Sequence, residues 1–286
     1  MNRETGVSDL LTSVLEEAFR EDIGFGDITS QAISQDQNLT GIFTAKQPGT
    51  VAGMDAVGIG YRILDPSVKV TLIKRDGDPV AAGDPIATVE GPADVLLAGE
   101  RVILNLLQHL SGIATAVRAA VRSMEGSPAR ICDTRKTIPG LRGLQKYAVR
   151  CGGGYNHRLR LDHGAMIKDN HIVAAGGIQQ AVEAVRNQCG LMVKLEVECE
   201  TEEEIREAVR AGADIIMLDN RTPDEVRTLR KLIPDTIIIE VSGGITPETA
   251  ATYRDCGADY ISIGSLTHSV IALDISFNLK GGKKLL

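Results

Sequence analysis

Basic side chains are concentrated in one stretch of an otherwise acidic chain. Between residues 135 and 168 stand eight Lys and Arg residues and a single acid, Asp162, although the whole chain carries a net charge of −7. Arginine binds carboxylates through two parallel hydrogen bonds, and lysine acts as a point charge on phosphates. The stretch therefore predicts a site for small, highly anionic substrates. For Arg142, Lys146 and Arg150, which stand at helical spacing, a solvated helix face is an equally good interpretation.

Two segments of this stretch carry the side chains best suited to such a site. One follows a predicted strand, and the other follows a run of three glycines that gives the backbone freedom to present its neighbours. Their candidate residues are Thr134, Arg135, Lys136, His157 and Arg158. The other histidines, His109, His163, His171 and His268, suit ordinary core or surface positions.

A later predicted strand, over 192–198, alternates charged and apolar side chains. Its apolar face must meet helices, so Lys194, Glu196 and Glu198 should point into the interior of the fold. Burying charge is unfavourable unless an ion pair, a metal or a ligand compensates it. A structural ion-pair network is one interpretation. The other is that Glu198, with Asp219 at the end of the next strand, holds Mg²⁺ or sugar hydroxyls.

Two glycine-containing loops follow the last two predicted strands. Glycine lets a phosphate approach backbone N–H groups, and the last two loops of an α/β barrel are a recurrent phosphate site. Either loop alone would be a weak signal, but two in succession favour a phosphate site over simple turn chemistry. The candidates are Ser242, Gly243, Gly244, Ile263, Gly264 and Ser265.

Strands and helices alternate from residue 130 onward, which predicts a parallel sheet. Polar side chains follow almost every strand, Lys168 among them, and in a barrel these strand ends converge on one mouth. An α/β barrel is therefore favoured over an open sheet. The predicted strands cover 130–133, 165–168, 192–198, 215–218, 236–241 and 260–263.

The first part of the chain has a different pattern. Apolar residues at helical spacing predict a helix over 8–20, and short β-branched runs between turn signals predict a small sheet over 41–91. A long helix should follow over 99–124, with Arg101 on its polar side.

Composition narrows the functional class. No apolar run approaches the roughly 20 residues that cross a bilayer, and no signal-peptide pattern opens the chain. Five widely spaced cysteines suit neither a disulfide framework nor a structural zinc site. The negative net charge argues against nucleic acid as a partner. Motifs of serine hydrolases, zinc proteases and P-loop NTPases are absent from the sequence. We expect a cytoplasmic enzyme.

Eight short motifs follow one another along the chain, at 21–24, 26–29, 100–101, 110–115, 133–137, 152–154, 156–158 and 167–171. Taken together, they resemble those of quinolinate phosphoribosyltransferase, also called nicotinate-nucleotide pyrophosphorylase (carboxylating), nearly end to end. The resemblance implies an N-terminal α/β sandwich over 1–112 and an incomplete, TIM-like α/β barrel over 113–286, with the C-terminal segment returning to the first domain.

The resemblance also implies a reaction. Quinolinate and phosphoribosyl pyrophosphate (PRPP) would give nicotinate mononucleotide, CO₂ and pyrophosphate, with Mg²⁺, in NAD biosynthesis. Arg135, His157 and Arg158, with Arg101 of a neighbouring subunit, would hold the two carboxylates of quinolinate.

The remaining roles follow from the same family. Lys136 and Lys168 would meet a carboxylate or the pyrophosphate. The carboxylates of Glu198 and Asp219 would meet the ribose and Mg²⁺, and the two glycine loops would meet the 5-phosphate. The resemblance further implies a homodimer whose sites are completed in trans, alone or as a trimer of dimers. Around the histidine loop, Arg160 adds charge where the family pattern has less, as does the nearby His163.

Two alternative functions remain. A paralogue associated with molybdenum transport shares this fold, although the full set of carboxylate-binding arginines favours quinolinate. A non-catalytic module that senses a phosphorylated metabolite would tolerate loss of Lys136, Lys168 and Glu198, and all three are present.

Overall fold

The computed structural model describes residues 3–34 and 37–280. Contacts within the chain divide it into two compact units. The first takes in the described residues of 1–118, 138–153 and 270–286, and the second takes in 119–137 and 154–269.

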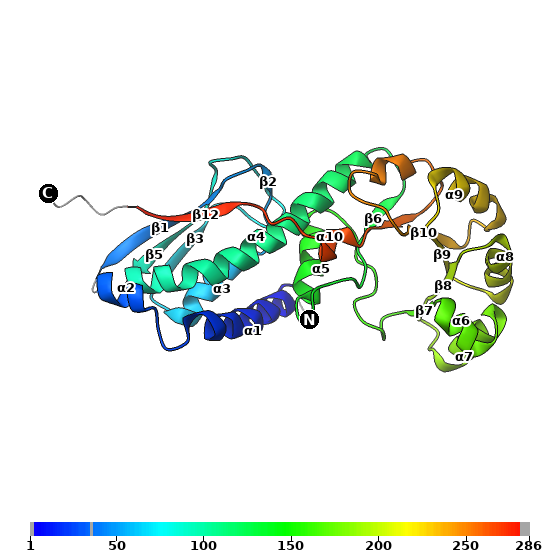
Figure 1. The fold of residues 1–286 in the computed structure, drawn as a ribbon, viewed down its shortest axis with the longest axis horizontal. Coiled ribbons are helices and arrows are strands. Elements are labelled where there is room, and N and C mark those ends of the chain that lie inside the picture. Colours follow the sequence, from blue (N-terminus) through cyan, green and yellow to red (C-terminus); the bar gives the residue numbers. More distant parts are fainter. Residues whose placement is uncertain (1–2, 35–36, 281–286) are drawn as a thin grey trace. The chain divides into compact units, whose positions relative to one another are not determined.

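The first unit is built around a four-stranded antiparallel sheet in the order β12-β1-β5-β3 (Figure 1). Phe43 of β1 is fully buried, with its ring centroid 4.8 Å from that of Phe277 and 6.4 Å from that of Tyr61. These aromatic rings form part of the core of this unit. Its strands are β1 (Asn38–Ala45), β3 (Lys69–Leu72), β5 (Pro85–Pro92) and β12 (Ile275–Lys280), and a separate pair joins β2 (Gly49–Thr50) to β4 (Pro79–Val80).

Helices complete the first unit. The long helix α4 (Ala93–Ser123) buries an apolar stripe that includes Ile103 and Leu107, whereas its Arg101 side chain is 59% exposed. This polarity confirms the amphipathic pattern of the sequence, although the helix begins six residues earlier than predicted, at Ala93. The other helices of the unit are α1 (Arg3–Ile23), α2 (Ile28–Ile33), α3 (Asp55–Leu64) and α5 (Arg142–Cys151).

The second unit is a parallel sheet of six strands in the order β6-β11-β10-β9-β8-β7. Among the described residues no pairing joins β6 to β7, so the barrel is incomplete at this seam. The predicted fold class, an α/β sandwich with an open parallel α/β barrel, is confirmed. The strands are β6 (Arg130–Cys132), β7 (Ala165–Ile167), β8 (Leu195–Cys199), β9 (Ile215–Asp219), β10 (Ile238–Ser242) and β11 (Tyr260–Ser262).

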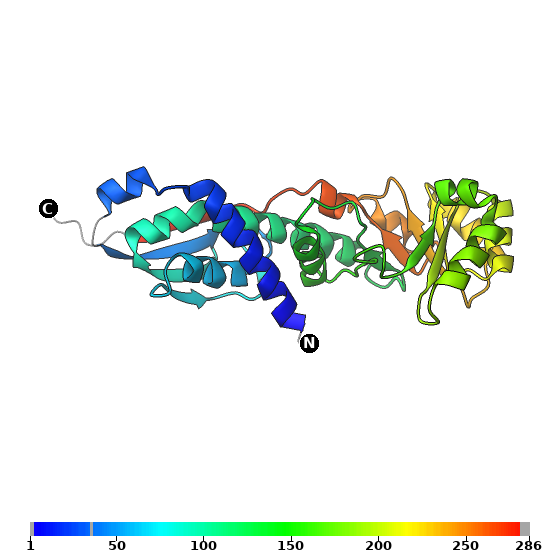
Figure 2. The same ribbon diagram turned by 90° about the horizontal axis from the view of Figure 1, so that it is seen from below.

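Helices cover the outside of these strands, as the green-to-yellow ribbons show in both views (Figures 1 and 2). On β8 the outward residues Leu195, Val197 and Cys199 are almost fully buried, which confirms the predicted alternation and leaves Glu196 and Glu198 facing inward. The helical elements are α6 (Asp169–Ala175), α7 (Ile178–Gln188), α8 (Glu202–Ala211), α9 (Pro223–Leu229), η1 (Arg230–Leu232), η2 (Ala250–Tyr253) and α10 (Ser265–His268).

Local sequence signals set the ends of these helices. Thr201 caps α8 by accepting a hydrogen bond from the amide of Glu204, and the Glu204 carboxylate accepts the Thr201 amide in return. Gly212 ends the helix in the left-handed conformation, with φ of 83°. A second capping box, of Thr222 with Glu225, starts α9. No helix in the described part of the chain is long and apolar enough to span a membrane.

Candidate active site

A cavity of about 380 Å³ lies at the carboxyl ends of the strands in the second unit. It brings together side chains from loops far apart in the sequence, as convergence at a barrel mouth requires. Most of its lining was singled out from the sequence, and Met166, Met217 and Glu240 were not. The lining consists of Thr134, Arg135, Lys136, His157, Arg158, Met166, Lys168, Glu198, Met217, Asp219, Glu240 and Ser242.

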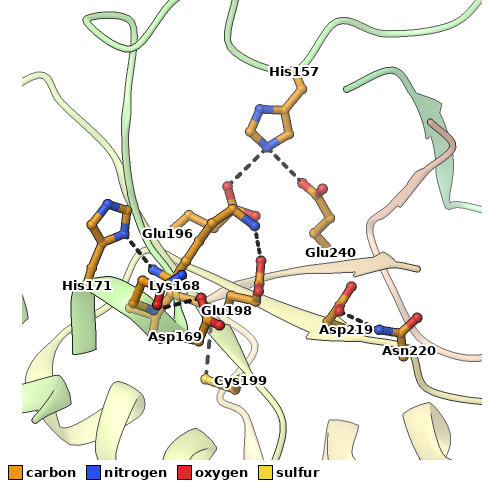
Figure 3. A network of polar contacts seen from close by, with 12 residues as sticks. His157, Lys168, Asp169, His171, Glu196, Glu198, Cys199, Asp219, Asn220 and Glu240 are labelled. Carbon is orange, nitrogen blue, oxygen red and sulfur yellow. Dashed lines mark hydrogen bonds and ion pairs between the residues drawn. The ribbon is translucent and has the colours of Figure 1, made fainter. Parts of the chain in front are cut away.

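Lys168 and Glu198 form the central ion pair of this cavity. The Nζ of Lys168 donates to Oε2 of Glu198, whose side chain is only 14% exposed (Figure 3). The backbone N–H of Lys168 donates to Nδ1 of His171, 3.0 Å away, at the start of α6. His171, expected from the sequence to be an ordinary core or surface residue, therefore fixes the backbone that presents Lys168.

A second carboxylate, Asp219, stands beside this pair at the end of β9. Burial and the negative charge of Glu198 raise the pKa of Asp219, while Lys168 and Lys136 act in the opposite direction. The side-chain amide of Asn220 donates to Oδ2 of Asp219, 2.6 Å away. Asn220 adopts φ of 53°, which is unusual for a residue other than glycine. In the sequence, the only indication of its role is its position directly after the end of a strand.

The backbone of Gly243 fits tightly against Asn220. A Cβ atom at Gly243, which has φ of 92°, would lie 2.8 Å from the backbone nitrogen of Asn220. Only glycine meets both requirements at this position. The loop after β10 therefore needs glycine to preserve the geometry around Asp219, a structural reason that the sequence interpretation did not include.

Apart from Ser242, the residues of the two glycine loops do not line the cavity. Gly264 lies near it, because a Cβ at that position would come 3.1 Å from Cδ of Lys136. Ile263 is fully buried, so its side chain belongs to the core. The hydroxyl of Ser265 is buried with no hydrogen-bond partner among the described atoms. Gly244 has φ of 65° with open space around it.

The two arginines lie on different segments of the mouth. Nη1 of Arg158 donates to the carbonyl of Gly164, 2.8 Å away. Burial and the nearby positive charge of Arg135 lower the pKa of Arg158, and the charge of Glu196 opposes this effect. Two guanidinium groups close enough to repel each other favour an anion between them.

The loop that carries Arg135 and Lys136 is held by hydroxyl groups. The amide of Lys136 donates to Oγ1 of Thr134 at 3.0 Å, and Oγ1 of Thr267 donates to the carbonyl of Lys136 at 2.9 Å. Thr134 therefore has a clear structural role in addition to its place on the cavity wall. Thr267 was not singled out from the sequence.

His157 reaches beneath the mouth into the barrel. Its Nε2 lies 3.0 Å from Oε2 of Glu196 and 3.3 Å from Oε2 of Glu240 (Figure 3). Burial opposes a charge on this ring, whereas hydrogen bonds to the two glutamates and their charges favour it and raise the pKa of His157. The amide of Arg158 donates to Nδ1 of His157 at 2.7 Å and resists a proton on that atom.

Glu240 is the main member of the site that sequence reasoning missed. It interrupts the apolar run of β10 at an inward position, the same signal that identified Glu196 on β8. The two residues that depart from the family pattern, Arg160 and His163, lie outside this network. They flank the exposed Asp162, with Nε of Arg160 3.0 Å from its carboxylate.

A parallel barrel whose mouth groups four Lys and Arg side chains with three carboxylates defines a site for small, multiply anionic substrates. The family model of the quinolinate phosphoribosyl transferase C-terminal domain matches residues 113–278, and that of the N-terminal domain matches residues 27–111. The chain belongs to the quinolinate phosphoribosyl transferase family, whose members are pentosyltransferase enzymes.

Individual relatives extend over nearly the whole chain. It is 53% identical to a probable nicotinate-nucleotide pyrophosphorylase (carboxylating) of Bacillus subtilis, over 94% of this chain and 93% of that protein. It is 41% identical to the nicotinate-nucleotide pyrophosphorylase (carboxylating) of Mycobacterium leprae, over 95% of this chain and 98% of that protein. The solved structure of the Francisella tularensis nicotinate-nucleotide pyrophosphorylase matches with a TM-score of 0.92 at 36% identity. The match covers 96% of this chain and 97% of that one.

Proposed function

We propose that this enzyme transfers the phosphoribosyl group of PRPP to quinolinate and releases CO₂ and pyrophosphate, giving nicotinate mononucleotide. The observation that carries the proposal is the mouth of the barrel, where Arg135, Lys136, Arg158 and Lys168 converge with the carboxylates of Glu198 and Asp219. Quinolinate and PRPP are both multiply anionic, and the family is named for transfer to quinolinate.

Arg135 and Arg158 are proposed to bind the carboxylates of quinolinate. Their guanidinium groups can each form two parallel hydrogen bonds to a carboxylate. Burial and the charge of Arg135 lower the pKa of Arg158, and a dianion between the two groups relieves their repulsion. Arg101 of a second subunit is proposed to add a third guanidinium, because this side chain is exposed on α4.

Lys136 and Lys168 are proposed to meet the pyrophosphate as it leaves. Loss of pyrophosphate from PRPP creates positive charge on the ribose and negative charge on the departing oxygens. The backbone amides of both lysines are held by hydrogen bonds, which would limit the reorganisation needed to stabilise the departing group. After the new bond forms, the pyridinium nitrogen stabilises carbanion character at the adjacent carbon as CO₂ departs, and that carbon then takes up a proton from water.

The carboxylates of Asp219 and Glu198 fit a magnesium ion whose other ligands are substrate oxygens and water. Burial and the charge of Glu198 raise the pKa of Asp219, so a divalent cation beside the two carboxylates is favourable. When bound, Mg²⁺ neutralises charge on the pyrophosphate. Asp219 is proposed to hold it together with Glu198, and Asn220 orients Asp219 for this role.

The phosphate of the ribose is proposed to lie against the loops 242–244 and 263–265. The buried hydroxyl of Ser265, which has no partner among the described atoms, supports a hydrogen bond to a phosphate oxygen. We further propose a homodimer, alone or as a trimer of dimers, and a cytoplasmic location, on the composition and the family resemblance.

Purified enzyme incubated with quinolinate, PRPP and Mg²⁺ should form nicotinate mononucleotide, CO₂ and pyrophosphate in equal amounts. Lys136→Ala, which lacks one positive charge of the mouth, is the matched control and should be inactive. A protein that binds quinolinate but forms no product would instead be the phosphometabolite-binding module. Failure to bind quinolinate at all would favour the molybdenum-associated function.

A further inference from the structure

Two buried glutamates inside the barrel have His157 as their common partner. The side chains of Glu196 and Glu240 are 4% and 5% exposed. Each uses Oε2 to contact Nε2 of His157, and the Oε1 atom of each has no hydrogen-bond partner among the described atoms. Two incompletely compensated carboxylates at the centre of a barrel are unfavourable for folding alone, so they call for a functional explanation.

The segment that ends in His157 lies beside β6 in the incomplete barrel. The amide of Tyr155 donates to the carbonyl of Ile131, and the carbonyl of Tyr155 accepts the amide of Asp133. Asp133 is fully buried and accepts hydrogen bonds from the side chain of Asn156, at 2.7 Å, and the amide of His157, at 2.8 Å. The glutamates of β8 and β10 hold the same segment from across the barrel interior.

The contacts of His157 form part of a partition between two cavities. A second cavity, of about 300 Å³, lies toward the amino ends of the strands and is lined by Lys194 and Tyr260, among others. His157, Arg158 and Glu240 line both cavities. A change in the contacts of His157 therefore acts directly on the floor of the substrate cavity and on Arg158, its neighbour in the chain.

The hydrogen bonds of the ring determine which nitrogen carries a proton. A backbone amide always donates, so Nδ1 of His157, 2.7 Å from the amide of Arg158, must accept. Nε2 then carries the proton and donates to the glutamates. The glutamate charges favour a second proton on the ring, but the amide occupies the position where that proton would lie. We therefore take the ring in this conformation as neutral, with its proton on Nε2.

The same three side chains are grouped closely enough to hold a metal ion, with their ligand atoms within 4.8 Å of one another. A metal would need the lone pair of Nε2, which would leave the ring of His157 without a proton on either nitrogen. The arrangement is thus a hydrogen-bonded support and not a metal site.

We propose that Glu196 and Glu240 are positioning residues for quinolinate recognition: they orient the His157 ring and, through it, place Arg158 at the floor of the mouth. The inference rests on the proposed function and goes beyond it by assigning a role to two residues that do not bind substrate. It also assigns the His157 ring a supporting role, because both of its nitrogens are engaged by the protein.

When it is ionised, Glu196 adds a second effect on the same group. Burial and Arg135 lower the pKa of Arg158, and Glu196 opposes them. The buried acid therefore offsets the repulsion between the two guanidinium groups before substrate arrives. This preorganisation should appear in the binding of quinolinate and not in that of PRPP.

The test compares two double variants. Glu196→Gln with Glu240→Gln keeps an oxygen that accepts from Nε2–H, whereas Glu196→Leu with Glu240→Leu removes it. We expect the leucine pair to raise KM for quinolinate about tenfold or more, with KM for PRPP changed less than about twofold. The glutamine pair should show a clearly smaller rise. Ser262→Ala, which removes another buried and unpartnered side-chain oxygen from β11, is the control and should leave both KM values unchanged.

A double-mutant cycle separates positioning from general stability. In a His157→Ala background the leucine pair should change KM for quinolinate by less than about twofold, because the element through which it acts is gone. Additive effects, or equal rises in both KM values, would overturn the proposal. If the leucine pair fails to fold, the single variant Glu240→Leu is used in the same cycle.

A spectroscopic measurement is independent of turnover. Nitrogen NMR of the His157 ring in the enzyme without substrate should show a protonated Nε2 and an Nδ1 that accepts a hydrogen bond. A protonated Nδ1 with an unprotonated Nε2 would overturn the proposal. Wild-type enzyme that makes no nicotinate mononucleotide yet shows this ring state would count against the proposed function and not against the support of His157.

Discussion

Nζ of Lys168, at the start of α6, donates to Oε2 of Glu198 at the end of β8, across the floor of the cationic mouth. The Lys168 side chain is 43% exposed, so the pair is not sealed in the core. Partly exposed ion pairs contribute little to folding. The same lysine lines the cavity at the mouth, the proposed substrate site, where a positive charge would have a large effect on a charged transition state.

Lys168→Ala should therefore reduce activity far more than stability. We expect kcat/KM to fall roughly 10²-fold or more, and the free energy of unfolding to change by less than about 1 kcal/mol. Turnover assays and denaturant unfolding measure the two quantities. Lys194→Ala, at the opposite end of the barrel interior, is the control and should retain activity. A Lys168 variant that unfolds early but turns over normally would assign this lysine to a structural ion pair.

Nicotinate, which lacks one of the two carboxylates of quinolinate, should be a poor substrate. With only one carboxylate in the mouth, either Arg135 or Arg158 would be left partly desolvated and unpaired. Sites built to bind a polar group reject analogues that lack it strongly, so we expect kcat/KM to be lower by roughly 10²-fold or more. Arg158→Ala should narrow the difference between the two substrates. Comparable values for both substrates with the wild-type enzyme would contradict the assignment of the arginines.

Stability should depend on pH through Glu196. Burial and the charge of Glu240 raise the pKa of Glu196 to about 7, against the opposing hydrogen bond of His157. In the unfolded chain a glutamate releases its proton near its ordinary value of 4.5. Between these values the folded state holds more protons, so the free energy of unfolding falls as pH rises.

Glu196→Gln lacks this titration, so its stability relative to wild type should increase as pH rises from about 4.5 to about 7. Denaturant unfolding across this range measures the difference in free energy of unfolding. Ser262→Ala changes no titrating group, so its free energy of unfolding should vary with pH as that of wild type does. If the difference in free energy of unfolding between Glu196→Gln and wild type does not change over this pH range, Glu196 is ionised throughout.

Helices and strands with a regular spacing of apolar residues were well predicted from the sequence, because that spacing shows which face of the element is buried. The alternation around Glu198 placed β8, and its polar end pointed to the mouth. Glu240 and Asn220 were missed for a physical reason. Their roles come from partners on other strands or loops, His157 and Asp219 among them, and a pattern along one strand carries no information about contacts across a barrel.

Arg101 lies on α4 with its side chain 59% exposed. We propose that it completes the site of a second subunit, so each mouth would need two chains. Arg101→Ala and Lys136→Ala should each be inactive as homodimers. In a mixed dimer one site collects both changes, and the other combines an intact Lys136 with an intact Arg101 from its partner.

Co-expression of the two variants should therefore restore activity. With random pairing, half of the dimers are mixed, and about a quarter of all sites should be intact under two-fold symmetry. Differently tagged chains allow the mixed dimers to be purified and assayed alone, where about half of the sites should be active. Verified mixed dimers with no more activity than either parent would show that Arg101 serves its own chain, or only the fold.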